Sequence, residues 1–423
     1  MCLSLFVCMT ASAYVFNAGF IDGVYYNLNT TDNTASVTCL YKNNRNASAY
    51  KGKVVIPSSI YYSGDIFSVT SIDRYAFQYC SGLTSITIPP SIEIIEGQAF
   101  YGCDGLSAVH ITDLEAWCNI SFSNASGNPL FYAHHLYLNG KEVKDLIIPE
   151  GITSIGTEAF AGGSGFTSIT IPSSVTSIGD VAFEQCSNLS SVSIPSSVIS
   201  IGWSPFADCS NIASIVVQEG NPAYDSRDNC NAIIETATNT LIMGCNQTII
   251  PEDIIYIAKG ALYGYNSIKS MNIPNNVEVI GDWAFSFCNN MASLVIPNSV
   301  TSIGEYAFYG CEGLADIYCY AESVPETDSY VFDYIEKKYV ILHVPASSIK
   351  EYKSTSPWNS FGKIVALTDE ETDVNALDVT TKCANPVDYY NIDGQKGLIP
   401  QQGVNIIQMS DGTTKKVLIN RRQ

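Results

Sequence analysis

The chain repeats one pattern of apolar and polar positions at a fixed spacing. Its clearest copy runs IPSSVTSIGDVAFEQCSNLSSVS from Ile171, and the next copy begins 23 residues later at Ile194. Every copy opens with an Ile-Pro pair, and the eight opening residues are Ile56, Ile88, Ile148, Ile171, Ile194, Ile250, Ile273 and Ile296. A period of about 20 to 50 residues indicates an array of stacked units, because one such unit cannot bury its own apolar face.

One slot in each copy holds a large apolar side chain, and we expect these side chains to form a continuous core. The slot is filled by Phe77, Phe100, Phe160, Phe183, Phe206, Phe285 and Phe308, and by Leu262 in the remaining copy. Neighbouring copies supply the wall that a single copy lacks, so stability is expected to be roughly a sum over repeats and their interfaces.

Each copy also predicts one short strand of a parallel sheet. From Leu189 to Ile194 the apolar residues have the spacing L-x-x-L-x-L, which is typical of a leucine-rich-repeat strand. Pro195 ends that strand because it has no N–H to donate. Val198 and Ile201 then predict a short extended stretch, and the Ala-Phe-x-x-Cys segment has room for one helical turn.

The spacing of the Ile-Pro pairs divides the chain into parts. Alternating residues predict an N-terminal β-hairpin cap over 14–53, followed by the repeats over 54–318. Two spacings exceed whole repeats and mark insertions near 112–147 and 218–249; Asn139-Gly140 in the first is a strong hairpin signal. We expect a C-terminal cap over 319–368, an acidic linker over 369–377 and a strand-rich tail over 378–423.

Cysteine is frequent, with 14 residues in the chain. Six of them occupy a second slot, three residues after the aromatic one, namely Cys80, Cys103, Cys186, Cys209, Cys288 and Cys311. Side chains stacked in one column have parallel Cβ vectors, a poor geometry for a disulfide, so buried thiols are predicted there. Cys230 and Cys245 flank a predicted hairpin and could face each other, which leaves a disulfide between them open.

Composition excludes several classes of partner. The chain carries 41 Asp and Glu against 21 Lys and Arg, a formal charge of −20. Nucleic acid and anionic membrane surfaces need a basic footprint, so neither is an expected partner. No stretch approaches the ~18 consecutive apolar residues of a transmembrane segment. Residues 1–13 combine a short apolar run with Ala11-Ser12-Ala13, which predicts a secretory signal segment and a secreted or surface location.

The repeat unit resembles the BspA-type leucine-rich repeat of cell-surface and secreted proteins of host-associated organisms. The resemblance covers about 54–318 and extends to insertion phrases such as DLEAWCNISF and GNPAYDSRDNCNAIIETATNTLI. It implies a right-handed leucine-rich-repeat solenoid, β-rich and parallel with short helical turns, and an adhesive or protein-binding role. The tail phrases YYNIDGQKG and GVNIIQMSDGTTKKVLI are similar to the small β-sandwich sorting domains of proteins exported by Bacteroidetes.

No motif for catalysis or cofactor binding is found in the sequence. His134-His135 and Cys118 lack the spacing of a zinc site, and neither a phosphate-binding loop nor a nucleophile elbow occurs. Asp225, Asp228 and Asn229 lack the EF-hand spacing for calcium. We therefore expect no enzyme, no cofactor and no metal.

Recognition, if present, is predicted in the first insertion. The outward strand positions repeat Ser and Thr, which discriminate poorly between partners, whereas the insertion concentrates large aromatic and imidazole groups. The candidate ligand contacts are Trp117, Tyr132, His134, His135 and Tyr137. Packing of this insertion against the solenoid is the alternative. The function expected is a monomeric binding or adhesion module for an extracellular protein or glycan, and the alternative is a structural surface-layer component without a specific ligand.

Overall fold

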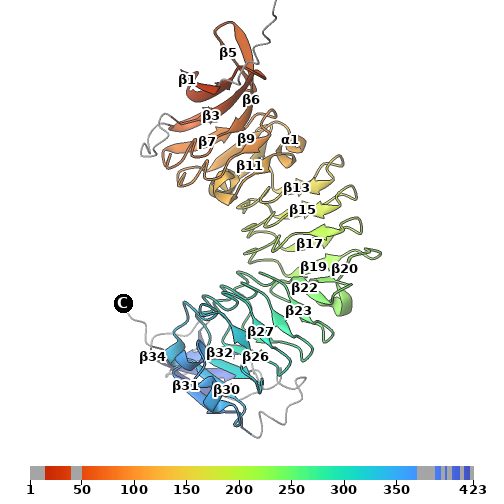
Figure 1. Cartoon of the computed structure of the whole chain (residues 1–423), viewed down its shortest axis with the longest axis vertical. Coiled ribbons are helices and arrows are strands. Elements are labelled where there is room, and N and C mark those ends of the chain that lie inside the picture. Colours follow the sequence, from red (N-terminus) through yellow and green to blue (C-terminus); the bar gives the residue numbers. More distant parts are fainter. Residues whose placement is uncertain are drawn as a thin grey trace, which may run out of the picture. The chain divides into compact units, whose positions relative to one another are not determined.

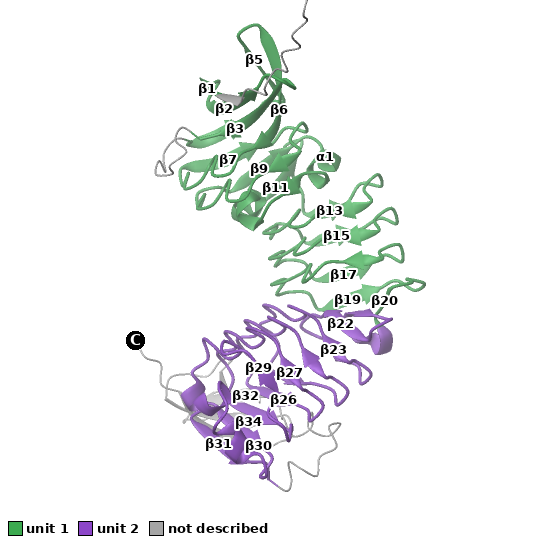
Figure 2. Cartoon of the chain, in the orientation of Figure 1, with its two compact units in different colours: residues 1–226 green, residues 227–423 purple. Residues whose placement is uncertain are grey.

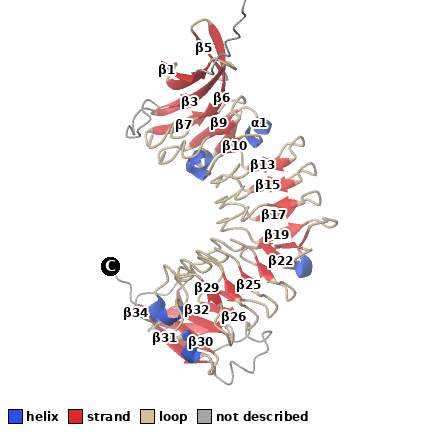
Figure 3. Cartoon of the chain, in the orientation of Figure 1, coloured by secondary structure: helices blue, strands red, loops and turns tan. Residues whose placement is uncertain are grey.

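The computed structural model describes residues 15–39 and 50–368, together with the tail strands 386–391, 396–397, 403–409 and 414–419. The predicted signal segment 1–13 and acidic linker 369–377 lie outside the described residues. Short strands joined by turns and loops are the main regular elements, with a few short helices (Figures 1 and 3). Two compact units divide the chain at 1–226 and 227–423 (Figure 2).

The N-terminal part of unit 1 is the predicted β-structure. Strands β1 (Val15–Ile21), β2 (Val24–Asn29) and β3 (Thr34–Thr38) form an antiparallel meander. Strand β3 then pairs in parallel with β6 (Asp65–Ile72), which also forms a hairpin with β5 (Ser59–Tyr62). Tyr50 covers the first repeat, because its buried ring lies 4.5 Å from the ring of Phe77 and its hydroxyl donates to the Thr38 carbonyl at 2.8 Å.

Two parallel ladders run through the repeats of unit 1. The predicted strand of each copy forms the first ladder, whose members are β4 (Gly52–Val55), β7 (Leu83–Thr87), β9 (Ala108–Ile111), β11 (Leu136–Leu138), β13 (Asp145–Ile147), β15 (Ser168–Thr170), β17 (Ser191–Ile194) and β19 (Ser214–Val217). This ladder is interrupted, because β4 to β11, β13 with β15, and β17 with β19 form separate sheets.

Short extended stretches form a second ladder, which is also divided: residues up to 122 and residues from 154 belong to separate sheets. After β6 its members are β8 (Ile94–Ile95), β10 (Ser121–Phe122), β14 (Ser154–Ile155), β16 (Ser177–Ile178) and β18 (Ser200–Ile201). Register follows the sequence period, since Ile155 pairs with Ile178 and Ile178 with Ile201. A final short strand of the unit is β20 (Tyr224–Asp225). One predicted strand per copy is therefore corrected to two.

Unit 2 has the same two ladders. The first contains β24 (Ser270–Asn272), β26 (Ser293–Ile296), β28 (Asp316–Cys319), β30 (Ile341–Val344) and β31 (Lys363–Ala366). The second contains β22 (Thr240–Met243), β23 (Tyr256–Ile257), β25 (Val279–Ile280), β27 (Ser302–Ile303) and β29 (Glu326–Thr327). Strand β21 (Ile233–Glu235) forms the predicted hairpin with β22.

The segment predicted as C-terminal cap continues the solenoid before closing it. Strands β29, β30 and β31 extend both ladders, with η3 (Lys337–Tyr339), α3 (Ile349–Tyr352) and η4 (Trp358–Ser360) between them. Phe332 stacks on Phe308 at 5.7 Å, and Trp358 and Phe361 pack edge-on against Phe332. The chain thus forms a β-solenoid of about 13 turns, more than the eight Ile-Pro copies, because insertions and cap add turns.

The aromatic slot is the centre of the core. Successive rings stack nearly parallel, with centroids 4.8 Å apart for Phe77 and Phe100, 5.5 Å for Phe160 and Phe183, and 5.2 Å for Phe183 and Phe206. All of these rings are buried. The Ala-Phe-x-x-Cys segment is a run of tight turns, not the predicted helical turn. In the copy around Phe285, Trp283 and Phe287 both have positive φ, at 57° and 58°, which is incompatible with a helix.

The column of cysteines is buried and unbonded to other cysteines, as predicted. Five thiols each donate to the carbonyl oxygen of the aromatic-slot residue one turn earlier, and the pairs are Cys103 to Phe77, Cys186 to Phe160, Cys209 to Phe183, Cys288 to Leu262 and Cys311 to Phe285. The distances range from 3.0 to 3.3 Å. The slot therefore joins consecutive turns by a hydrogen bond as well as by packing.

The tail contains strands, as its alternating residues predict. Strands β32 (Pro386–Asn391), β33 (Lys396–Gly397), β34 (Gly403–Met409) and β35 (Thr414–Ile419) form an antiparallel sheet in the order β33-β32-β34-β35. Among the described residues, no helix has the length and apolar character needed to cross a membrane.

Candidate functional site

The insertion near 112–147 folds as an irregular turn of the solenoid. Asp113 begins helix α1 (Leu114–Cys118) by accepting a hydrogen bond from the Ala116 N–H at 3.0 Å. After α1 come β10, η1 (Ala125–Gly127), α2 (Leu130–Ala133) and β11. Because β10 joins β8 and β11 joins β9 in parallel, the insertion extends both ladders. The Asn139-Gly140 hairpin prediction is confirmed by the antiparallel pairing of β11 with β12 (Lys141–Glu142).

Trp117 anchors this insertion in the core. Only 1% of its surface is exposed, and its indole Nε1 donates to the carbonyl oxygen of Ala159 at 3.1 Å. The neighbouring Cys118 is also buried, and burial raises the pKa of its thiol to about 12. A ligand at the surface therefore cannot contact Trp117 in this conformation, and a thiol with so high a pKa is a poor nucleophile at neutral pH.

The two histidines of the insertion make separate contacts within the protein. The Nδ1 atom of His134 lies 2.9 Å from the carbonyl oxygen of Gly162, and that of His135 lies 2.7 Å from a carboxylate oxygen of Glu142. His134 adopts φ of 63° at the end of α2, which turns the chain back toward β11. The structure does not bring the pair together with Cys118 as a metal site, and no group of three or more His, Cys, Asp or Glu residues in the described part of the chain could hold a metal ion.

Tyr132 and Tyr137 are half-buried, whereas His134 and His135 are exposed. The ring of Tyr137 lies 4.9 Å from the imidazole of His110 on the neighbouring strand β9. Partial burial raises the pKa of the Tyr132 hydroxyl, so the hydroxyl is protonated at neutral pH. Of the five predicted contacts, Trp117 is a core residue, while Tyr132, His134, His135 and Tyr137 lie at or near the surface.

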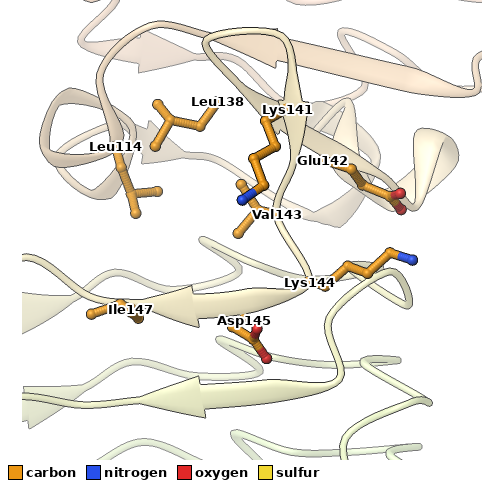
Figure 4. Close-up of a pocket in the computed structure, with 8 residues that line it drawn as sticks. All are labelled: Leu114, Leu138, Lys141, Glu142, Val143, Lys144, Asp145 and Ile147. Atoms are coloured by element: carbon orange, nitrogen blue, oxygen red, sulfur yellow. The ribbon is translucent and has the colours of Figure 1, made fainter.

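A groove of about 670 Å³ lies beside this insertion (Figure 4). Its apolar lining is Leu114, Leu138, Val143 and Ile147, and its charged lining is Lys141, Glu142, Lys144 and Asp145. Figure 4 shows Leu114, Leu138 and Lys141 on one side of the space and the strand that carries Asp145 and Ile147 on the other. The groove thus separates the β11–β12 hairpin from β13.

Sequence reasoning missed a cluster of aromatic side chains on unit 2. These residues flank the buried aromatic slot in consecutive turns, and we call them the aromatic surface: Tyr263, Trp283, Phe287, Tyr306, Tyr309, Tyr330 and Tyr334. Trp283 stacks on Tyr306 at 4.2 Å, and Tyr306 stacks on Tyr330 at 5.4 Å. A second row joins Phe287 to Tyr309 at 5.3 Å, and Tyr309 to Tyr334 at 4.7 Å.

The aromatic surface is accessible although its rings pack on one another. Tyr330 is 48% exposed and Tyr334 is 73% exposed, while the other five side chains are partly buried. Gly310 has φ of 69°, and a Cβ there would lie 2.8 Å from the Phe287 ring, so only glycine lets that ring lie flat against the next turn. Partial removal from water, followed by the Glu305 carboxylate, raises the pKa of the Tyr306 hydroxyl, which therefore remains a hydrogen-bond donor.

Three of the equivalent positions in unit 1 carry carboxylates, at Glu158, Glu184 and Asp208, whereas Tyr75, Tyr79 and Tyr101 occupy such positions in earlier turns. Burial raises the pKa of both Glu158 and Glu184 to about 7, and each is raised further by a neighbouring carboxylate. Burial also raises the pKa of Asp208 in the next turn. One oxygen of Glu158 is buried without a hydrogen-bond partner. Glu158, Glu184 and Asp208 together make the acidic column of unit 1.

The repeat strands and the turns between them match a model of the BspA type leucine rich repeat region over residues 58–128, 133–236 and 238–354. The chain belongs to the BspA type leucine-rich repeat family. Membership agrees with the solenoid and the aromatic column, which the sequence alone predicts, and with the first of the two ladders. No curated protein matches the chain.

Solved leucine-rich repeat structures resemble this BspA type chain. A leucine rich cell surface protein from Faecalibacterium prausnitzii is 23% identical with a TM-score of 0.53, and the match covers 86% of this chain and 97% of that one. The pneumococcal vaccine antigen PcpA is 18% identical with a TM-score of 0.47, covering 84% and 99%. A leucine-rich repeat protein from Bacteroides ovatus is 21% identical with a TM-score of 0.36, covering 82% and 76%. The first of these likenesses supports the fold.

Proposed function

We propose that the chain is a non-catalytic binding or adhesion protein, secreted or held at the cell surface, that presents a rigid solenoid to an extracellular protein or glycan. The observation that carries this proposal is the aromatic surface of unit 2. Tyrosine and tryptophan bury large areas with few rotatable bonds and are enriched at the energetic centres of interfaces. A monomeric protein has little other use for seven neighbouring aromatic side chains outside its core.

Two further observations support the location and the partner. The similar protein of Faecalibacterium prausnitzii is described as a cell surface protein. The chain is acidic, with a formal charge of −20, which disfavours nucleic acid and anionic lipid as partners. We include in the proposal that the tail, whose strands β32 to β35 form one antiparallel sheet, directs sorting after export.

The test is binding of the whole chain to arrays of extracellular proteins and glycans, followed by titration of each hit. Saturable binding that is lost in a Tyr306→Ala, Tyr330→Ala double variant supports the proposal. The matched control is Tyr61→Ala with Tyr256→Ala, because both residues are exposed tyrosines outside the aromatic surface. Absence of any saturable hit would favour a structural surface-layer component without a specific ligand.

A further inference from the structure

The first ladder of unit 1 is interrupted beside the insertion. Strand β11 pairs with β9 on one side and with β12 on the other, so the sheet β4-β7-β9-β11 ends in the β12 hairpin. Within the described part of the chain, the strand of the next turn, β13, pairs with β15 alone. An edge strand presents unpaired backbone groups that can pair with another chain.

The backbone direction of β13 can be assigned from its hydrogen bonds. In a parallel ladder, alternate residues of a strand bond to the neighbour on each side. The Lys144 carbonyl accepts from the Thr167 N–H at 2.8 Å, and the Ile148 N–H donates to the Thr170 carbonyl at 3.0 Å. The even-numbered residues therefore bond to the β15 side. Asp145 and Ile147 direct their N–H and C=O groups to the opposite edge, where no other strand of the described residues pairs with β13.

The groove beside this edge has apolar walls at a suitable position. Leu114, Leu138 and Val143 line it opposite β13, and Ile147 on β13 is 63% exposed (Figure 4). An isoleucine so exposed on an edge strand is an attractive partner for an apolar side chain of an added strand.

The four charged side chains of the groove sum to zero formal charge, but only the two carboxylates are held by other side chains. Glu142 is paired with His135 at 2.7 Å, and the Asp145 carboxylate accepts from the Ser168 hydroxyl at 2.6 Å. Lys141 and Lys144 form no ion pair with any described residue. Two uncommitted ammonium groups at one groove are notable in a chain with a formal charge of −20. Each of these ammonium groups is available to pair with a carboxylate of a bound segment.

We propose that an extended acidic peptide segment of a partner protein binds in this groove by adding a strand to β13. Its backbone pairs with Asp145 and Ile147, its alternate apolar side chains contact Leu114, Leu138 and Ile147, and its carboxylates approach Lys141 and Lys144. Main-chain hydrogen bonds supply affinity in this mode, and the side-chain contacts supply specificity. The inference deepens the binding role proposed above but assigns it to a surface distinct from the aromatic surface.

The test uses fluorescence anisotropy with the full chain and a labelled eight-residue peptide of alternating Glu and Val. Two matched probes are the same peptide with Lys in place of Glu, and the acidic peptide N-methylated at alternate residues, which keeps the side chains but blocks strand pairing. The acidic peptide is expected to bind, and each of the two matched probes at least about tenfold more weakly. Equal binding of the N-methylated peptide would overturn strand addition.

Variants locate the binding. Lys141→Glu with Lys144→Glu is expected to weaken the acidic peptide at least about tenfold, while the control Lys51→Glu with Lys269→Glu, two exposed lysines elsewhere, has little effect. Because a variant can fail to fold, hydrogen exchange on the unaltered chain provides a second readout. The bound peptide should slow exchange of the Asp145 and Ile147 amides, and unchanged exchange at both would overturn the proposal.

The outcomes also separate this inference from the proposed function. If the acidic peptide does not bind but array partners still bind through the aromatic surface, strand addition is contradicted and the proposed binding function stands. If the peptide binds at β13 but no array partner depends on Tyr306 and Tyr330, the aromatic surface is rejected as the binding site and strand addition stands.

Discussion

The thiol of Cys209 donates a hydrogen bond to the carbonyl oxygen of Phe183, one turn earlier in the solenoid, at 3.1 Å. The same carbonyl also accepts from the Cys186 N–H within its own turn. One oxygen thus closes a local turn and links two turns. This geometry needs a small side chain that can donate, which explains why cysteine recurs in the slot.

Replacing Cys209 tests whether the slot is defined by size. Cys209→Ala should lower the free energy of unfolding by about 1 kcal/mol, because it loses one weak hydrogen bond and little volume. Cys209→Leu should cost more, about 1 to 3 kcal/mol, because the site is fully buried and closely packed. Urea unfolding measures both. A leucine variant as stable as the parent would show that the column has spare room.

The cysteines of the column should react slowly with thiol reagents in the native protein. Burial raises the pKa of Cys103 and Cys288 to about 12, so almost no thiolate is present at pH 8. Titration with a thiol-specific disulfide reagent is expected to be slow in the native chain and rapid in denaturant without reductant. Equally low titres in both conditions would mean that the column cysteines are oxidised.

The stacked phenylalanines should carry much of the stability of unit 1. Phe183 is fully buried between Phe160 and Phe206, so Phe183→Ala is expected to cost about 3 to 5 kcal/mol through lost burial and the cavity left behind. Thermal unfolding provides the measurement, with Tyr61→Ala, an exposed tyrosine of the same unit, as control. A Phe183→Ala melting temperature within one degree of the parent is incompatible with a core column.

The acidic column predicts stability that declines as the pH rises. The pKa of Glu184 is about 7 in the folded chain, above its ordinary value of 4.5, so the folded state binds more protons between these values. Its contribution is therefore fully present below about pH 4.5 and is lost as the pH rises through 7. Glu184→Gln should raise the melting temperature at pH 8, on the order of 2 °C, and change it less at pH 5.

An exposed glutamate provides the control for this pH effect. Glu150 lies on the surface of the same unit, so Glu150→Gln should shift the melting temperature little at either pH. A gain in Glu184→Gln that is equal at pH 5 and pH 8 would show that packing, and not ionisation, causes it.

Variants in the insertion should show that some of its residues stabilise the fold and others contact a partner. Trp117→Ala is expected to cost about 3 to 5 kcal/mol, because it removes a buried indole and leaves the Ala159 carbonyl without that donor. Tyr132→Ala with Tyr137→Ala should leave the melting temperature within a few degrees and reduce binding of any partner that uses this surface. Binding titrations beside thermal unfolding distinguish the two effects; a large loss of stability in the tyrosine variant would assign these rings to packing.

The repeat, its core column and its strands follow from the sequence because each rests on a local pattern repeated many times. Phe183 recurs in register with its neighbours, and a misassignment in one copy is corrected by the others. The strand pairing of the insertion could not be predicted in the same way. The pairing of β11 with β9, and the absence of pairing between β12 and β13, depend on contacts between turns. The insertion occurs once, so no other copy in the sequence shows which strands pair.

The aromatic surface was missed for a different reason. Trp283 and Tyr306 occupy left-handed backbone positions, with φ of 57° and 56°, where glycine is the usual signal. A buried Ala-Phe pair directly follows each of them, so an apolar run of this kind predicts core for every member. The recurrence of aromatics two residues before Phe285 and Phe308 was the available sign that a second, outward column exists.

The registers of both ladders have a consequence for how such a molecule changes length. Ile155, Ile178 and Ile201 pair across turns at intervals of one repeat, and the thiol-to-carbonyl bonds span a constant 26 residues. Gain or loss of one whole repeat therefore rejoins the ladder bonds, ring stacks and thiol contacts across the junction. Turns of slightly different length also keep the ladders, since Ser302 pairs with Glu326 and Asp316 with Ile341. The length of the solenoid can therefore change by whole repeats. Recombination between copies would add or remove repeats while keeping the same core contacts.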